Sequence, residues 1–206
     1  MPTLPKSLLW VRTDSPGTDH ALFDDSHGLL AHGTAQAAIP VPYTCRYELT
    51  TDETWAAKRL VVSVEGAGWL RSVRLESSGG QWRVSTAEEG DLDAALAAAR
   101  QPPVGLPGTE DPGRLDDAVD VDLGAAPLFN ALPVRRLGLQ DAPPGTSHTL
   151  KVVWVLVPSL LVVPAEQTYT ALEGGNVHYA SEGFSADLQL DADGYVLNYP
   201  GLAQRG

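Results

Sequence analysis

The amino-acid sequence predicts an all-β protein, mainly antiparallel, and two observations support this fold class. Short runs in which apolar and polar residues alternate recur along the chain, separated by Gly, Asp and Pro. Alternation with period two is typical of strands that bury one face. Turn signals rich in glycine then join neighbouring runs, as expected for antiparallel hairpins.

The clearest strands are predicted at residues 43–50, 60–64 and 184–191, where every second residue is apolar. Residues 152–157 are apolar on both faces, so we expect a strand there that is covered on both sides. Three hairpin turns are expected because their residues tolerate positive φ. These turns are Ser78-Gly79-Gly80, Gly174-Gly175-Asn176 and Asp193-Gly194.

A single short helix is predicted near residues 91–100, with Asp91 as its N-cap and Arg100 at its C-terminal end. The following residues, about 101–118, are acidic and rich in Pro and Gly, which predicts an exposed, mobile loop. We expect residues 1–206 to form one domain, because a chain that is 43% hydrophobic and 206 residues long can build a single core.

Charge and hydropathy narrow the possible partners. The net charge of -12 opposes binding to phosphate backbones and to anionic membranes, so we expect no nucleic-acid partner. The longest apolar stretch, residues 152–163, is interrupted by Pro158 and is well below the ~20 residues of a transmembrane helix. The N-terminus has no signal-peptide core and Cys45 is a lone cysteine, so we expect a cytoplasmic protein.

No motif predicts a cofactor or a metal ion. Gly66-Ala67-Gly68 lacks the third glycine of a dinucleotide fingerprint, and residues 191–194 fit a hairpin turn better than a calcium loop. The five histidines lack the spacing of metal ligands. We expect Cys45, which shares an apolar strand face with Tyr43 and Tyr47, to pack in the core.

The strongest candidate for catalytic chemistry is the pair Asp120 and Asp122. Residues two apart on a strand point to the same face at ~7 Å, within the ~6.5–9.5 Å that separates the carboxyl groups of inverting glycosidases. Ion pairs with Arg135 and Arg136 are the alternative interpretation. We favour a structural or binding role over acid-base catalysis, because the sequence shows no perturbed pKa.

Three stretches of the sequence carry a resemblance to a known family. Residues 120–123 (Asp-Val-Asp-Leu) and 127–137 (Pro-Leu-Phe-Asn-Ala-Leu-Pro-Val-Arg-Arg-Leu) resemble the central signature of the putative glycolipid-binding family, and residues 191–202 resemble its ending. Two threonines of that signature are absent, since Phe129 and Ala131 stand in their places. The resemblance implies a spiral β-roll, one long sheet wound on itself, with a shape likened to bacterial lipoprotein and glycolipid carriers.

These observations together predict a non-enzymatic binding or carrier protein for an amphipathic ligand such as a glycolipid. We expect the apolar tail inside the β-roll and the polar head at its rim. The predicted wall residues are Trp69, Trp82, Trp154, Tyr169, Tyr179 and Tyr199. The predicted head-binding residues are Asp120, Asp122, Asn130, Arg135 and Arg136. Only one arginine of the adjacent pair is expected to face the core side, because neighbours on a strand point to opposite faces.

Two alternatives belong to other functional classes. The first is a hydrolase that acts on a glycoside or an ester through Asp120 and Asp122, which requires both carboxylates in one cleft. The second is a scaffold protein that uses an exposed sheet edge or the acidic loop as an interaction surface. The sequence leaves the ligand and the oligomeric state open.

Overall fold

The computed structural model describes residues 5–108 and 110–206. Seven strands come first: β1 (Lys6–Arg12), β2 (Gly17–Asp24), β3 (Leu30–Ala37), β4 (Tyr43–Thr51), β5 (Ala57–Gly66), β6 (Trp69–Ser78) and β7 (Gln81–Gly90). A connection with short helices and one strand follows: α1 (Leu92–Ala98), η1 (Pro112–Leu115), β8 (Asp120–Leu123), η2 (Pro127–Asn130) and α2 (Ala131–Arg136). The remaining elements are β9 (Ser147–Val155), β10 (Val162–Ala171), η3 (Glu173–Gly175), β11 (Val177–Ser181), β12 (Phe184–Leu190), β13 (Val196–Tyr199) and β14 (Ala203–Arg205).

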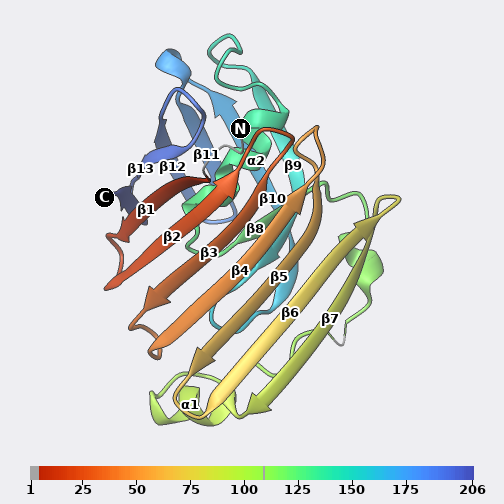
Figure 1. Ribbon diagram of the computed structural model, residues 1–206, viewed down its shortest axis with the longest axis vertical. Helices are drawn as coiled ribbons and strands as arrows, with labels where there is room; N and C mark the ends of the chain where they lie inside the picture. Colours follow the sequence, from red (N-terminus) through yellow and green to blue (C-terminus); the bar gives the residue numbers. More distant parts are fainter. Residues whose placement is uncertain (1–4, 109) are drawn as a thin grey trace.

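The fourteen strands of the described residues form one sheet. Its order is β7-β6-β5-β4-β3-β2-β1-β14-β13-β12-β11-β10-β9-β8, with β7 and β8 at the two edges. All neighbouring pairs are antiparallel except β8 and β9, which are parallel. The strands β1–β7 form a broad front leaf, and β8–β10 lie behind it (Figure 1). The prediction of a mainly antiparallel all-β fold built from one wound sheet is therefore confirmed.

All three predicted hairpin turns are confirmed. Ser78 pairs with Gln81 at the tip of the β6–β7 hairpin, where Gly79 and Gly80 have φ angles of 60° and 81°. Glycine adopts these positive angles without the steric cost that a side chain would bring. The other two turns join β10 to β11 and β12 to β13. The strand predicted at residues 152–157 is also present as the end of β9, between β8 and β10.

The helices agree with the prediction only in part. Helix α1 begins after Asp91, whose side chain accepts a 2.8 Å hydrogen bond from the backbone N–H of Ala94, as an N-cap does. Helix α2 was not predicted, and the placement of Arg135 and Arg136 on a strand is wrong. Residues 127–134, which precede the two arginines, are all buried. The sequence there therefore lacks the polar face that marks an amphipathic helix.

The segment predicted as an exposed loop is attached to the sheet at several points. The guanidinium of Arg71 donates a 2.8 Å hydrogen bond to the backbone oxygen of Gly105, and the Thr86 hydroxyl donates to that of Pro107. Leu115 in η1 is fully buried, and η1 contacts β7. The segment thus covers the edge strand β7, which limits pairing with another chain at that edge.

The interior of the roll is filled by the chain itself. Leu128, Phe129 and Leu132, from η2 and α2, are fully buried against side chains of the front leaf. Val134, further along α2, packs with residues of β10–β13 in a second apolar cluster. The space in which we predicted an apolar tail is therefore occupied by protein side chains.

The close packing of Tyr47 on Gly33 gives a prediction for stability. A Cβ atom at Gly33 would lie 1.9 Å from Cζ of Tyr47, whose hydroxyl donates a 3.1 Å hydrogen bond to Asp19. Gly33→Ala is therefore expected to lower the free energy of unfolding by about 1–3 kcal/mol, measured by urea denaturation. Gly124→Ala is the matched control, because its Cβ would meet no atom closer than 3.4 Å. Equal stability of the two variants would contradict the prediction.

Candidate ligand-binding pocket

A pocket of about 220 Å³ lies among the strands of the C-terminal half of the sheet, and six elements contribute to its walls. The side chains that give it chemical character are Asp122 of β8, Asn130 of η2, Trp154 of β9, Tyr179 of β11, Phe184 of β12 and Tyr199 of β13. Five of these six were predicted as wall or head-binding residues. The structure thus brings together residues that are up to 77 positions apart in the sequence.

Three aromatic rings form one side of the pocket. The ring centroids of Tyr179, Phe184 and Tyr199 lie 6.0–6.2 Å from one another, so each ring contacts the other two. The register of β11 and β12 explains this, because Phe184 pairs with Ser181, two residues from Tyr179 on the same face. Phe184 is 43% exposed, and an accessible apolar surface beside polar groups is typical of a binding site.

A chain of hydrogen bonds holds the polar side of the pocket. The Gln167 amide donates a 2.7 Å hydrogen bond to the carboxylate of Asp122. The Tyr169 hydroxyl lies 3.0 Å from Oδ1 of Asn130 and 3.3 Å from Oε1 of Gln167. Tyr169 is buried behind the pocket, so its predicted place in the wall is corrected to a support for Asn130 and Gln167.

Asp120 and Asp122 have different partners although they share one face of β8. Arg136 donates from Nε and Nη2 to the two carboxylate oxygens of Asp120, which is 1% exposed. The predicted ion pair between this aspartate and an arginine of the pair is therefore present. Arg135 points elsewhere: it lies over the ring of Trp55 and donates to the backbone oxygen of Asp193.

Burial is the main reason why the pKa of both aspartates is raised. It raises the pKa of Asp122 to about 6, although the amide of Gln167 and a backbone N–H oppose this shift, and the nearby charge of Asp120 adds to it. Burial also raises the pKa of Asp120, and here the guanidinium of Arg136 acts in the opposite direction. Asp122 forms no ion pair with any of the described basic side chains.

A second, larger hollow of about 820 Å³ adjoins the pocket and shares four lining residues with it: Trp154, Tyr179, Ser181 and Glu182. It lies where β10 extends beyond the end of β11, because residues 162–166 of β10 pair with β9 alone. Val163, Pro164 and Ala165 are apolar residues of its lining, and Val163 and Ala165 share one face of the strand. We call this hollow the β10 groove. Pocket and groove together form a continuous surface with polar and apolar parts.

Two predicted wall residues lie outside the pocket. Trp82 donates from its indole nitrogen to the backbone oxygen of Ala118 at 2.9 Å, and it holds the connection to β8 against β7. Trp69 packs on Gly66 at the other end of the front leaf, where a Cβ would lie 2.5 Å from the indole nitrogen. Both indoles are buried in the core, as large aromatic residues of a β protein often are.

Three residues of the site were absent from our prediction. Gln167 precedes Tyr169 by two positions, so the period of a strand already placed it on the same face. Phe184 begins a predicted strand directly after Glu182-Gly183, a turn that exposes its first residues. Glu182 lines both the pocket and the β10 groove from this turn. The signal was the strand period for Gln167 and a position at the β11–β12 turn for Glu182 and Phe184.

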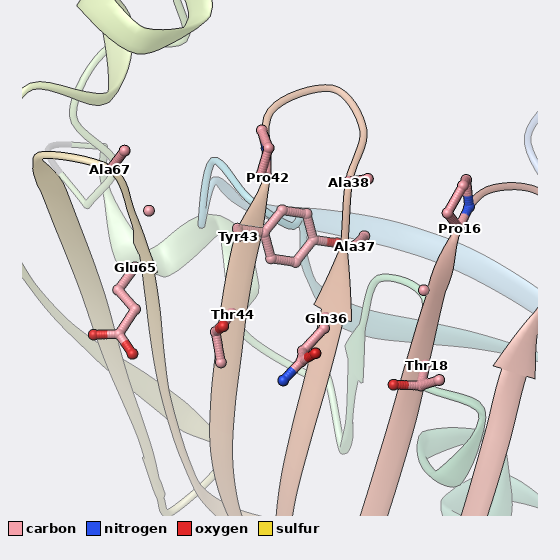
Figure 2. A pocket seen from close by; sticks show the side chains of 12 residues that line it. Pro16, Thr18, Gln36, Ala37, Ala38, Pro42, Tyr43, Thr44, Glu65 and Ala67 are labelled. Carbon is pink, nitrogen blue, oxygen red and sulfur yellow. The ribbon is translucent and has the colours of Figure 1, made fainter.

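Another hollow, of about 670 Å³, lies on the outer face of the front leaf (Figure 2). Thr18, Gln36, Thr44 and Glu65 reach into it from neighbouring strands, and Tyr43 is its single aromatic side chain. That ring is 7% exposed and its hydroxyl accepts a hydrogen bond from Arg12. The hollow therefore lacks an exposed aromatic ring such as that of Phe184, and we assign the candidate site to the pocket at Asp122.

Comparison with known proteins agrees with this architecture. The sequence matches the family described as "Putative glycolipid-binding" over residues 7–205. The chain belongs to this family. A crystal structure of a DUF1089 family protein from Pseudomonas aeruginosa is similar to this chain, with 25% sequence identity, 94% of each chain covered and a TM-score of 0.69. A comparison with curated proteins finds no significant match. Within the described part of the chain, no helix has both the length and the hydropathy to cross a bilayer.

Proposed function

We propose that this protein is a non-catalytic carrier or sensor that binds an amphipathic small molecule, such as a glycolipid, at the pocket and the β10 groove. The observation that supports the proposal most is the cluster of Tyr179, Phe184 and Tyr199 beside Asp122, in which the ring of Phe184 is exposed. Ligand sites in proteins commonly combine an apolar, aromatic wall with a few placed polar groups. The family description is consistent with such a ligand.

The two hollows suit different parts of one molecule. A sugar ring has hydroxyl groups that donate hydrogen bonds to the carboxylate of Asp122, and apolar C–H faces that pack on the rings of Phe184 and Tyr199. An alkyl chain suits the apolar side chains of Val163 and Ala165 in the β10 groove, where burial of apolar surface is favourable. The head in the pocket and the tail in the groove would meet at Trp154.

The position of Asp120 favours this proposal over the hydrolase alternative. A glycosidase needs two carboxyl groups on either side of the scissile bond. Both oxygens of Asp120 are bound by Arg136, and the residue does not line the pocket. Of the two carboxylates in that hypothesis, only Asp122 faces the ligand space. We therefore assign binding to Asp122 and a structural role to Asp120.

The first test is native mass spectrometry of freshly purified protein, followed by denaturing extraction. We expect a reproducible adduct that is extracted as a molecule with an alkyl chain. Titration with octyl glucoside below its micelle concentration is the second test, with the fluorescence of Trp154 and the other tryptophans as the signal. Absence of both an adduct and saturable octyl glucoside binding would overturn the proposal.

Phe184→Ala is expected to weaken octyl glucoside binding by about tenfold, because one aromatic contact contributes about 0.5–1.5 kcal/mol beyond its buried area. The side chain is partly exposed, so its loss leaves the core intact. Leu197→Ala is the matched control: Leu197 is another exposed apolar residue of the same part of the sheet, outside the pocket. Equal binding by both variants would place the ligand elsewhere.

A further inference from the structure

The charges that line the pocket are all negative. Asp122 and Glu182 contribute carboxylates, and no Lys, Arg or His is among its described lining residues. The arginines on either side of Asp122 in the sequence have other partners: Arg136 binds Asp120, and Arg135 lies over Trp55. Arg114 donates to the backbone oxygen of Val162. Lys151 of β9 donates instead to the backbone oxygen of Asp116. The pocket therefore has a negative potential that no neighbouring side chain neutralises.

The two aspartates of β8 differ in whether an arginine binds them, and this difference points to the kind of ligand. A buried carboxylate is commonly paired with a cation or kept protonated by a raised pKa, as Asp19 is, since an uncompensated charge in a low-dielectric site is costly. Asp120 follows this rule through Arg136. Asp122, two residues further on the same face, receives an amide from Gln167 and faces the pocket with no cation. The place that a cation would occupy near Asp122 is open to a ligand.

The three aromatic rings, like the carboxylates, favour a positively charged ligand. The face of an aromatic ring carries negative potential and attracts cations, and groups of such rings recognise ammonium ligands. Tyr179, Phe184 and Tyr199 are mutually within 6.2 Å, and Trp154 lines the same pocket. Glu182 adds a second, exposed carboxylate at the rim, where it forms no ion pair with a described side chain.

We infer that the pocket selects a polar head that carries a positively charged amino group, such as an amino sugar, over a neutral or anionic head. This inference rests on the proposed function, because it specifies the ligand class of the same site. An ammonium group at Asp122 supplies the missing counter-charge and donates a charge-assisted hydrogen bond to the carboxylate. A phosphate or carboxylate head would face Asp122 and Glu182 and is repelled.

Three ligands with one octyl tail separate the effect of charge from that of shape. Octyl glucoside has a hydroxyl where octyl glucosaminide has an amino group, and the N-acetylated glucosaminide is neutral but larger. At about pH 7 the amino group is largely protonated and Asp122, with a pKa of about 6, is mostly ionised. Octyl glucosaminide is expected to bind at least about tenfold more tightly than octyl glucoside, measured by calorimetry, since a hydrogen bond to a charged group contributes about 1.5–3 kcal/mol.

Asp122→Asn tests whether that preference depends on the carboxylate. The change keeps the size of the side chain, and the ratio of the two affinities is expected to fall to about one, which is the loss of the charged hydrogen bond. Asp187→Asn is the matched control, because it removes the same charge from β12 on the face away from the pocket. This variant is expected to keep the wild-type ratio. Thermal unfolding of both variants shows whether they are folded.

The possible outcomes separate the inference from the function on which it rests. A preference for the glucosaminide that disappears in Asp122→Asn supports both. Equal affinities for the two glycosides in the wild-type protein, or tighter binding of octyl glucoside, overturn the inference and leave the proposed function standing. A preference that survives in Asp122→Asn also overturns it. Absence of binding for all three ligands, together with absence of a native adduct, rejects the proposed function itself.

Discussion

Arg136→Met is expected to lower the free energy of unfolding by about 3–5 kcal/mol, because it leaves the carboxylate of Asp120 buried without its cation. Asp120 is 1% exposed, and Arg136 binds both of its oxygens. Methionine retains much of the apolar length of the arginine, so the change acts mainly on the charge. Urea denaturation at neutral pH measures the loss.

Two further variants test the cause of that loss. Arg46→Met removes an arginine from the exposed ion pair with Glu65, where the expected loss is below about 1 kcal/mol. Asp120→Asn added to Arg136→Met removes the unpaired charge and is expected to recover part of the stability. The argument fails if Arg136→Met costs no more than Arg46→Met, or if the double variant is less stable than Arg136→Met alone.

Asp19→Asn is expected to stabilise the protein at neutral and alkaline pH. Asp19 is fully buried in β2, and the Tyr47 hydroxyl is its hydrogen-bond partner at 3.1 Å. Burial raises the pKa of Asp19 from 3.8 to about 7, although the hydrogen bond from Tyr47 opposes this shift. Between these two values the folded protein retains a proton that the unfolded chain has lost. Stability therefore falls as the pH rises through this interval.

The size of this effect follows from the two pKa values. For Asp19 they predict a loss of up to about 4 kcal/mol between about pH 4 and about pH 8, and Asp122 contributes a loss of the same sign. Asparagine cannot ionise, so the advantage of Asp19→Asn over the wild type should grow with pH across this range. Chemical denaturation at a series of pH values measures the difference between the two proteins, in which the contribution of Asp122 cancels.

Tyr47→Phe is the informative companion of this variant. It removes the hydroxyl that favours the charged form of Asp19, so its loss of stability is expected to be larger at about pH 8 than at about pH 5. A difference between Asp19→Asn and the wild type that does not change with pH would show that Asp19 titrates normally in the folded protein. It would also remove the proposed origin of the pH dependence.

The sequence alone determined the strands and turns of the front leaf. Alternation along residues 43–50 correctly predicted that Tyr43, Cys45, Tyr47 and Leu49 are buried. The pair Gly79-Gly80 marked a hairpin correctly, and Asp91 marked the start of α1. These features are local: the period of a strand, a positive φ angle or an N-cap depends on residues within a few positions of one another.

The tertiary structure decided where the functional groups meet. No local pattern distinguished Trp154, which lines the pocket, from Trp69 and Trp82, which are buried in the core. The apolar residues before Arg135 and Arg136 suited a strand as well as a helix, and in the folded protein they form η2 and the start of α2. The hydrogen bond between Asp122 and Gln167 joins residues that are 45 positions apart in the sequence. The one between Asp120 and Arg136 joins residues that are 16 positions apart. Periodicity states which face of a strand is buried, but the winding of the whole sheet decides which side chains lie opposite that face.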